Sequence, residues 1–153
     1  MCRPEPQFLL EIVRKVHENL PFNLRLGLKV SHMGTDGAGF RLVMKSEFRS
    51  NWAPGALDDA IVSAVLDATG NLMASVCAVE NMQGLSYDEV EQWVSHIASV
   101  QMHIDRIKPA VGQEFLSIGT LVEADAEVAV IRTELKNENG VLIAMGTSRY
   151  ILE

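Results

Sequence analysis

Residues 58–79 read DDAIVSAVLDATGNLMASVCAV, an acidic pair followed by a long apolar stretch. An acidic pair in this position is typical of a helix start, because a side-chain oxygen caps free N–H groups and the charge favours the positive end of the helix dipole. The residues after the pair are apolar on most faces of a helix. We therefore expect a buried central helix that begins at this pair.

The flanking chain predicts further helices and strands. Apolar residues at helical spacing predict an amphipathic helix over residues 6–20, and Ser86 with Glu89 gives a capping-box signal for a helix over Tyr87–Ile97. Alternating apolar residues predict a hairpin over residues 25–45. Four more strands are expected: Val100–Ile107, Phe115–Glu123, Glu127–Lys136 and Val141–Leu152.

Short turns join these four strands, which predicts an antiparallel meander. The apolar helix packed on its inner face gives an α+β domain, an antiparallel β-sheet wrapped around a long central α-helix. We expect residues 1–153 to form one such domain, with an N-terminal helix in residues 1–20 and a helical insert in residues 80–97. Such a sheet has edge strands and an uncovered outer face, so we expect the protein to oligomerise.

The composition excludes several classes of protein. The chain has 153 residues, a net charge of −7 and a pI near 5.1, with no cluster of Lys or Arg. It therefore lacks the basic surface that binding to nucleic acid or to an anionic membrane requires. Cys2 and Cys77 form no disulfide pattern, and the N-terminal residues do not resemble a signal peptide. We expect a cytoplasmic protein that binds neither nucleic acid nor membrane.

Asp67 is the main candidate for chemistry, because it is the only charged residue between Ala60 and Val79. A carboxylate in a buried helix is costly unless it is hydrogen-bonded or paired, and such groups cluster at functional sites. At helical spacing it has small or weakly polar neighbours: Ala60, Ser63, Ala64, Gly70, Asn71 and Ala74. This stripe either leaves room for a ligand or lets helix and sheet approach closely while backbone donors satisfy Asp67.

The start of the central helix is a second candidate. Free N–H groups at residues 58–61, together with the helix dipole, suit a developing oxyanion. Ordinary capping is the alternative interpretation, since every buried helix needs it.

Several offsets along the chain match one known pattern. Gly55 and Leu57 precede the stretch from Asp58 to Asp67, and Gly119, Ala126–Val130 and Asn139–Thr147 come later, in the tail. In this order, over residues 21–152, they resemble the hotdog-fold acyl-CoA thioesterases of the phenylacetyl-CoA thioesterase type. The resemblance implies a hotdog fold, a homodimer or homotetramer, and hydrolysis of the thioester of a small or medium acyl-CoA.

The resemblance also implies roles for individual residues. Asp67 matches the family's catalytic acid, which activates the attacking water or attacks the thioester itself. Asp59 takes the place of the first Gly of the family's His-Gly-Gly motif, whose backbone N–H polarises the thioester carbonyl. Ser99 matches a Ser or Thr that reaches the site from the neighbouring subunit. Substrate-binding residues are expected at Asn51 (one position before the family's active-site Asn), Ala60, Asn71 and Lys108.

Two features depart from the family's pattern. Asp58-Asp59-Ala60 replaces His-Gly-Gly and adds two carboxylates, which oppose a developing negative charge. The insert in residues 80–97 adds a short helix that we expect beside the pocket. The alternative function is therefore a non-catalytic acyl-CoA or fatty-acyl binding module.

Other kinds of site are less well supported. The four histidines show no metal-ligand spacing, and neither a nucleotide-binding glycine loop nor a Gly-x-Ser-x-Gly elbow occurs. His103 and Asp105 share one face of a strand and form either an acid/base pair or a solvent-facing pair. We expect no metal and no cofactor.

Overall fold

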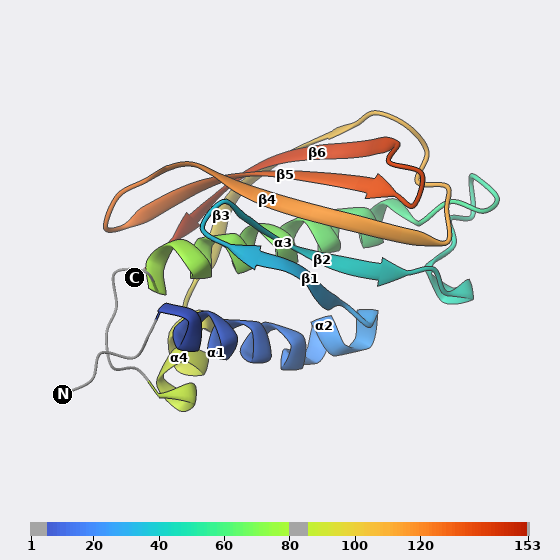
Figure 1. The fold of residues 1–153 in the computed structure, drawn as a ribbon. Coiled ribbons are helices and arrows are strands. Elements are labelled where there is room, and N and C mark those ends of the chain that lie inside the picture. Colours follow the sequence, from blue (N-terminus) through green and yellow to red (C-terminus); the bar gives the residue numbers. More distant parts are fainter. Residues whose placement is uncertain (1–5, 80–85, 153) are drawn as a thin grey trace.

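Helix α3 (Asp59–Val79) lies beneath a six-stranded sheet (Figure 1). The computed structural model describes residues 6–79 and 86–152. Helix α1 (Pro6–Asn19) covers α3 on the side away from the sheet. The predicted buried central helix is confirmed, and its apolar core positions are Val62, Val65, Leu66, Leu72, Met73, Ala74, Val76 and Val79.

All neighbouring strands of the sheet are antiparallel, in the order β1-β2-β4-β5-β6-β3. The strands are β1 (Lys29–Gly34), β2 (Gly37–Val43), β3 (Ala98–Arg106), β4 (Glu114–Ala124), β5 (Val128–Asn137) and β6 (Leu142–Ile151). The predicted α+β architecture, an antiparallel sheet around a long central helix, is confirmed.

The predicted meander of the last four strands is correct for β4, β5 and β6 and wrong for β3, which pairs with β6 at the edge of the sheet. The reason lies in the link over residues 107–113, which is not a hairpin turn. Its Ala110 carbonyl accepts a hydrogen bond from the Leu57 N–H at 3.0 Å, and Val111 forms a β-bridge with Ala56. The link is thus tied to the chain just before α3, and β4 pairs with β2 and β5 instead.

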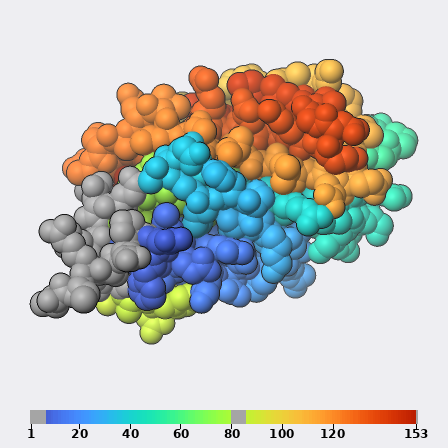
Figure 2. All heavy atoms as spheres, viewed as in Figure 1, coloured from blue at the N-terminus to red at the C-terminus, as the bar shows by residue number. Residues whose placement is uncertain are grey.

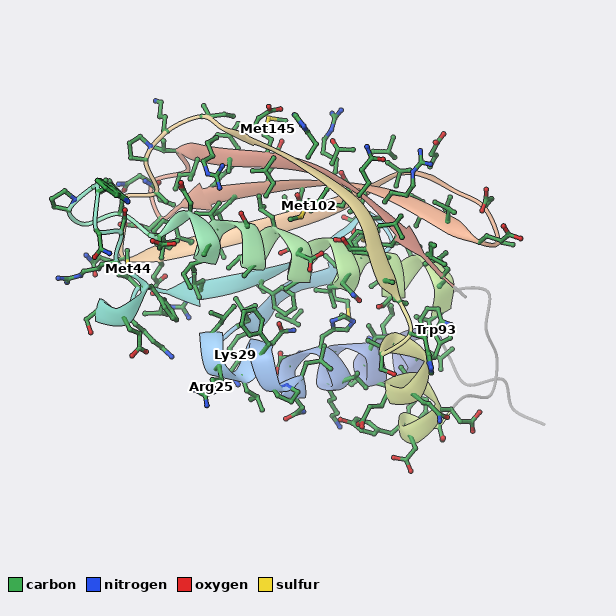
Figure 3. The ribbon with its side chains drawn as sticks, turned by 180° about the vertical axis from the view of Figure 1, so that it is seen from behind. Arg25, Lys29, Met44, Trp93, Met102 and Met145 are labelled. Atoms are coloured by element: carbon green, nitrogen blue, oxygen red, sulfur yellow. The ribbon has the colours of Figure 1, made fainter. Side chains whose placement is uncertain are left out.

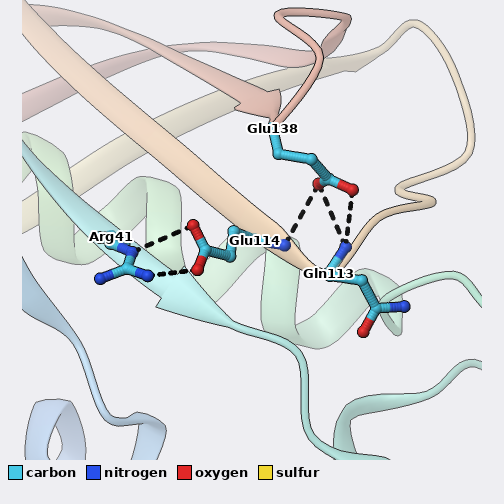
Figure 4. A network of polar contacts seen from close by, with 4 residues as sticks. All are labelled: Arg41, Gln113, Glu114 and Glu138. Atoms are coloured by element: carbon cyan, nitrogen blue, oxygen red, sulfur yellow. Dashed lines mark hydrogen bonds and ion pairs between the residues drawn. The ribbon is translucent and has the colours of Figure 1, made fainter.

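Polar contacts to the β5–β6 turn fix the far end of this link (Figure 4). The Glu138 carboxylate accepts hydrogen bonds from the N–H of Gln113 at 3.1 Å and from the N–H of Glu114 at 3.2 Å. Backbone N–H groups of Glu138 itself, Gln113 and Glu114 lower the pKa of Glu138. The Glu114 side chain also pairs with Arg41 on β2. The link is therefore held at both ends.

β1 and β2 form the predicted hairpin, but it starts later than expected. Residues Pro21–Leu26 form a short helix, α2, which Gly27 ends in the left-handed conformation with a φ of 72°. Proline suits the first turn of a helix and glycine suits this cap. The alternation of Leu26 with Leu28 therefore does not mark a strand, although both side chains are buried.

Ser86 is the predicted N-cap of α4 (Tyr87–Val94), and Glu89 contacts it through the Ser86 hydroxyl. The Glu89 N–H donates to the Ser86 hydroxyl at 3.3 Å, and the same hydroxyl lies 3.1 Å from Glu89 Oε1. The helix ends at Val94 instead of Ile97. α4 packs against α1, near the C-terminal end of α3 (Figure 1). Residues 80–85 of the predicted insert lie outside the described residues.

By length and composition alone, α3 is apolar enough to cross a membrane. In this fold 56% of its most apolar 18-residue window is buried inside the molecule. The space-filling view shows β1, β2 and α1 covering most of α3 on this face (Figure 2). We therefore interpret α3 as the core helix of the fold, around which the sheet is wrapped.

Candidate active site

The start of α3 is capped by Asp58, as the acidic pair predicts. Asp58 Oδ1 accepts a hydrogen bond from the Ala60 N–H at 2.9 Å. Its carbonyl accepts from the N–H groups of Ile61 at 3.0 Å and Val62 at 3.2 Å. The Asp58 N–H in turn donates to the Phe48 carbonyl at 2.7 Å, which anchors the start of the helix to the preceding chain.

A pocket of about 450 Å³ opens beside this helix start. The pocket is lined by the loop before α3, the first turn of α3, the link that follows β3, and β6. The lining residues are Ser50, Trp52, Ala53, Ala56, Leu57, Asp59, Val62, residues 106–110, Ile143 and Ala144. Two predicted site residues, Asp59 and Lys108, line it. Trp52, at its rim, is 93% exposed.

The negative charge of Asp59 at the pocket is offset by an ion pair with Arg106. Arg106, at the end of β3, places its Nε 3.0 Å from Asp59 Oδ1 and its Nη2 3.5 Å from the Ser63 hydroxyl. Both partners of the ion pair are substantially exposed, with 49% and 72% of the Arg106 and Asp59 side chains accessible. The sequence did not single out Arg106, although strand alternation from Met102 and Ile104 places it on the inner face.

Asp67 lies near the middle of α3 and is half-buried, so the expectation of a fully buried carboxylate was wrong. The hydroxyl of Tyr150, on β6, lies 3.1 Å from Asp67 Oδ1 and 3.0 Å from the Asp67 carbonyl, and donates to both acceptors. Burial of Tyr150 and the charge of Asp67 raise the pKa of the tyrosine. Tyr150 therefore remains a hydrogen-bond donor at all ordinary pH values.

The small residues beside Asp67 on α3 differ in their exposure. Ala60, Ser63, Ala64 and Asn71 are fully or partly exposed and form, with Asp67, the open side of α3. Gly70 is buried: a Cβ atom there would lie 2.1 Å from the Tyr150 hydroxyl oxygen. Ala74 is also buried. At Gly70 the absence of a side chain lets the sheet approach the helix, whereas Ala60, Ser63, Ala64 and Asn71 stay accessible within the protomer.

The open side of α3 lies next to the edge strand β3, which Figure 3 shows running past the helix. Ser99, on β3, is exposed, and its Cα is the register partner of Tyr150, the residue that contacts Asp67. Asp67 itself is two helical turns behind Asp59, roughly 12 Å along the helix axis at 1.5 Å per residue. It does not line the pocket, and neither do Asn51, Ala60, Asn71 or Ser99.

The structure also places the His103–Asp105 pair and the helix of the predicted insert. His103 Nε2 lies 3.1 Å from Asp105 Oδ1, with both side chains at least 70% exposed, so this is a solvent-facing pair. The helix of the insert does not lie beside the pocket: α4 packs at the opposite end of α3, where Figure 3 places Trp93. Within residues 6–79 and 86–152, no group of three or more His, Cys, Asp or Glu is arranged to hold a metal ion.

Comparisons with known proteins agree on one family, although no protein-family model matches the chain. The medium/long-chain acyl-CoA thioesterase YigI of Escherichia coli strain K12 is 27% identical over 134 residues, covering 88% of this chain and 86% of its own. A Shewanella oneidensis protein related to the thioesterase superfamily has a TM-score of 0.88 at 30% identity, covering 99% of this chain and all of that chain. A candidate thioesterase from Syntrophus aciditrophicus has a TM-score of 0.82 at 31% identity, covering 96% of this chain and 97% of its own.

Proposed function

The chain belongs to the thioesterase superfamily, and from this premise we propose that it hydrolyses the thioester of acyl-CoA at the open side of α3. The observation that carries the proposal is the state of Asp67. It is half-exposed on a stripe of small residues, and one of its oxygens is held by Tyr150. No other hydrogen bond to this carboxylate occurs among the described residues, so its second oxygen is available to a water molecule or a substrate.

Asp67 acts on the thioester in one of two ways. As a general base it takes a proton from water while the water oxygen attacks the thioester carbon. As a nucleophile it attacks that carbon itself, and water then hydrolyses the anhydride. On either route the carbon–sulfur bond breaks, the coenzyme A sulfur leaves and is protonated to the thiol, and a carboxylic acid is released.

Asp67 lies roughly 12 Å along the helix axis from Asp59 of its own chain, too far for both to reach one thioester group. In this mechanism the N-terminus of α3 of a second subunit therefore holds the thioester oxygen. Asp58 already accepts the Ala60 N–H, which removes that group from the set of free donors. We therefore assign the Asp59 N–H as the donor to the developing oxyanion, where the positive end of the helix dipole adds to it. Arg106 offsets the Asp59 carboxylate, which would otherwise oppose that charge.

The pocket at the helix start binds the substrate. Lys108 provides positive charge for the phosphate groups of coenzyme A, and Val62, Ile107 and Ile143 provide apolar contacts for the acyl chain. The relative YigI is named for medium- and long-chain acyl-CoA, so we propose medium to long chains where the sequence alone suggested small or medium ones.

A second subunit completes the site. β3 is the edge of the sheet and carries exposed apolar side chains, including Val100 at 52% and Met102 at 36% exposure, which suit pairing with a second copy. In a homodimer or homotetramer of this kind, Ser99 of the neighbouring chain would reach the open side of α3 and help to place water. We propose a cytoplasmic location, consistent with the absence of a disulfide pattern in the sequence.

The proposal is tested with purified protein and acyl-CoAs from C4 to C16, with the release of free thiol as the measurement. Asp67→Asn should abolish turnover, since the amide neither accepts the proton nor attacks the thioester. Asp36→Asn, an exposed aspartate on the β1–β2 turn, is the matched control and should retain wild-type rates. Tight binding of acyl-CoA without thiol release would instead support the non-catalytic binding module.

A further inference from the structure

We propose that Tyr150 is a positioning residue for Asp67, holding one carboxylate oxygen so that the other faces the reacting water or thioester. This inference rests on the proposed function and assigns a task to a residue that the sequence did not single out. Its basis is the double contact of the Tyr150 hydroxyl, 3.1 Å to Asp67 Oδ1 and 3.0 Å to the Asp67 carbonyl.

The double contact fixes the side chain relative to its own helix. The carbonyl of Asp67 is part of α3 and does not move independently of it. A hydroxyl shared between this carbonyl and Oδ1 therefore restrains rotation of the carboxylate about its side-chain bonds. A restrained catalytic group loses less entropy on reaching the reactive geometry than a free one.

Burial of Tyr150 makes the restraint rigid. The tyrosine is completely buried, with Ser99 and Ala129 as its register partners on the two neighbouring strands. Gly70 leaves the space that its hydroxyl occupies, because a Cβ there would lie 2.1 Å from the oxygen. The ring is thus confined on the sheet side and on the helix side, and the hydroxyl has a fixed position.

A purely structural role is the competing explanation. A buried tyrosine hydroxyl needs one acceptor, and the Asp67 carbonyl alone satisfies that need. The contact to Oδ1 is not needed to satisfy the hydroxyl. It links the buried Tyr150 to the half-buried Asp67 carboxylate. The two explanations predict different results when the hydroxyl is removed: loss of stability alone, or loss of stability together with altered catalysis.

Within residues 6–79 and 86–152, no ion pair involves Asp67. Tyr150 approaches Asp67 from β6. Arg106 approaches from β3 but contacts Ser63 and Asp59, one and two helical turns before Asp67. A loss of kcat in a Tyr150 variant is therefore attributable to the lost hydroxyl.

The test compares Tyr150→Phe with Ser117→Ala, since each removes one buried hydroxyl between α3 and the sheet. Ser117 lies 2.6 Å from the Thr69 hydroxyl on α3 and has no contact with Asp67. Tyr150→Phe should lower kcat about ten- to hundredfold with KM changed less than about threefold. Ser117→Ala should lower the melting temperature without this loss of kcat.

A second measurement keeps the hydroxyl and the shape of the side chain. Tyr87 and Tyr150 are the two tyrosines of the chain, so in a Tyr87→Phe background 3-fluorotyrosine labels position 150 alone. The fluorinated side chain still donates to Asp67 and should keep kcat within about threefold of the Tyr87→Phe parent. Wild-type kcat in Tyr150→Phe, or an equal loss of kcat in both Tyr150 variants, would overturn the inference while leaving the thioesterase function intact. An inactive wild-type protein would overturn the proposed function, and with it this inference.

Discussion

Arg106, the last residue of β3, holds Asp59, the first residue of α3, through a 3.0 Å contact between Nε and Oδ1. The two aspartates at the helix start therefore do different work. Asp58 accepts the Ala60 N–H as a cap, whereas Asp59 carries a charge that a neighbouring strand offsets. The negative pair that replaces His-Gly-Gly is thus compatible with an oxyanion site at this helix end, because one of its charges is paired.

Removing this compensation should impair the enzyme. Arg106→Gln leaves the Asp59 charge beside the proposed oxyanion site, and we expect kcat/KM for acyl-CoA to fall about two- to fivefold. The effect is modest because an exposed pair contributes on the order of 1 kcal/mol or less. Asp59→Asn in the same chain should restore most of the loss, which a double-mutant cycle of kcat/KM measures.

The Arg41–Glu114 pair is the matched control for this cycle, since its side chains are exposed to a similar degree, 50% and 43%, away from the pocket. Arg41→Gln should leave kcat/KM unchanged. Asp59→Asn alone should raise activity slightly. A drop in activity of Asp59→Asn with the fold intact would mean that the Asp59 carboxylate itself takes part in the reaction.

Asp58 should contribute to stability through its side-chain oxygen. Asp58→Ala removes the acceptor of the Ala60 N–H and should destabilise the protein by about 1 kcal/mol. For a chain of this size that corresponds to a melting temperature lower by about 2–4 °C. Asp58→Asn keeps an oxygen in place and should lose clearly less in the same thermal melts. Equal losses in both variants would show that charge, and not the cap, is what matters.

Local signals predicted most of the fold. The central helix, the Ser86 N-cap of α4 and the short hairpin turn between β5 and β6 each depend on residues close together in the chain. In that hairpin the Asn137 side chain accepts from the N–H of Asn139 at 3.0 Å, and Gly140 adopts a φ of 76°. The position of β3 was not predicted, because it depends on the Leu57–Ala110 contact between segments more than fifty residues apart.

In the candidate site, too, local signals were predicted and contacts between distant residues were not. Asp67 was recognisable as a lone charge in an apolar helix, whereas its contact with Tyr150 joins residues 83 positions apart. Arg106 and Asp59 are also far apart in the chain. Strand alternation places Arg106 on the inner face of β3 but does not indicate Asp59 as its partner. The sequence therefore identified the catalytic candidates Asp59 and Asp67. It did not identify Arg106 and Tyr150, which contact them, because these lie on strands whose positions depend on the tertiary fold.

His17, on α1, introduces a pH-sensitive group into the core away from the proposed site. Its side chain is completely buried, and Nε2 lies 3.0 Å from the Ser75 hydroxyl of α3. Its Nδ1 atom has no hydrogen-bond partner among the described residues. Burial lowers the pKa of His17 to about 3, because the charged imidazolium is poorly solvated there.

The protein should consequently lose stability as the pH falls from neutrality. A histidine has a pKa of about 6.5 in the unfolded chain, so between about 6.5 and 3 the unfolded state binds the proton that the folded state excludes. The stabilisation is complete above pH 6.5 and should decline by up to about 1.4 kcal/mol per pH unit below it. His17→Leu removes this titration, and Ser75 still donates to the Asn71 carbonyl at 2.8 Å. Urea unfolding at pH 7.5, 6 and 5 should therefore show a flatter decline for His17→Leu than for the wild type, whereas the surface variant His96→Gln should follow the wild type. A decline of His17→Leu parallel to the wild type would place the acid sensitivity in other groups.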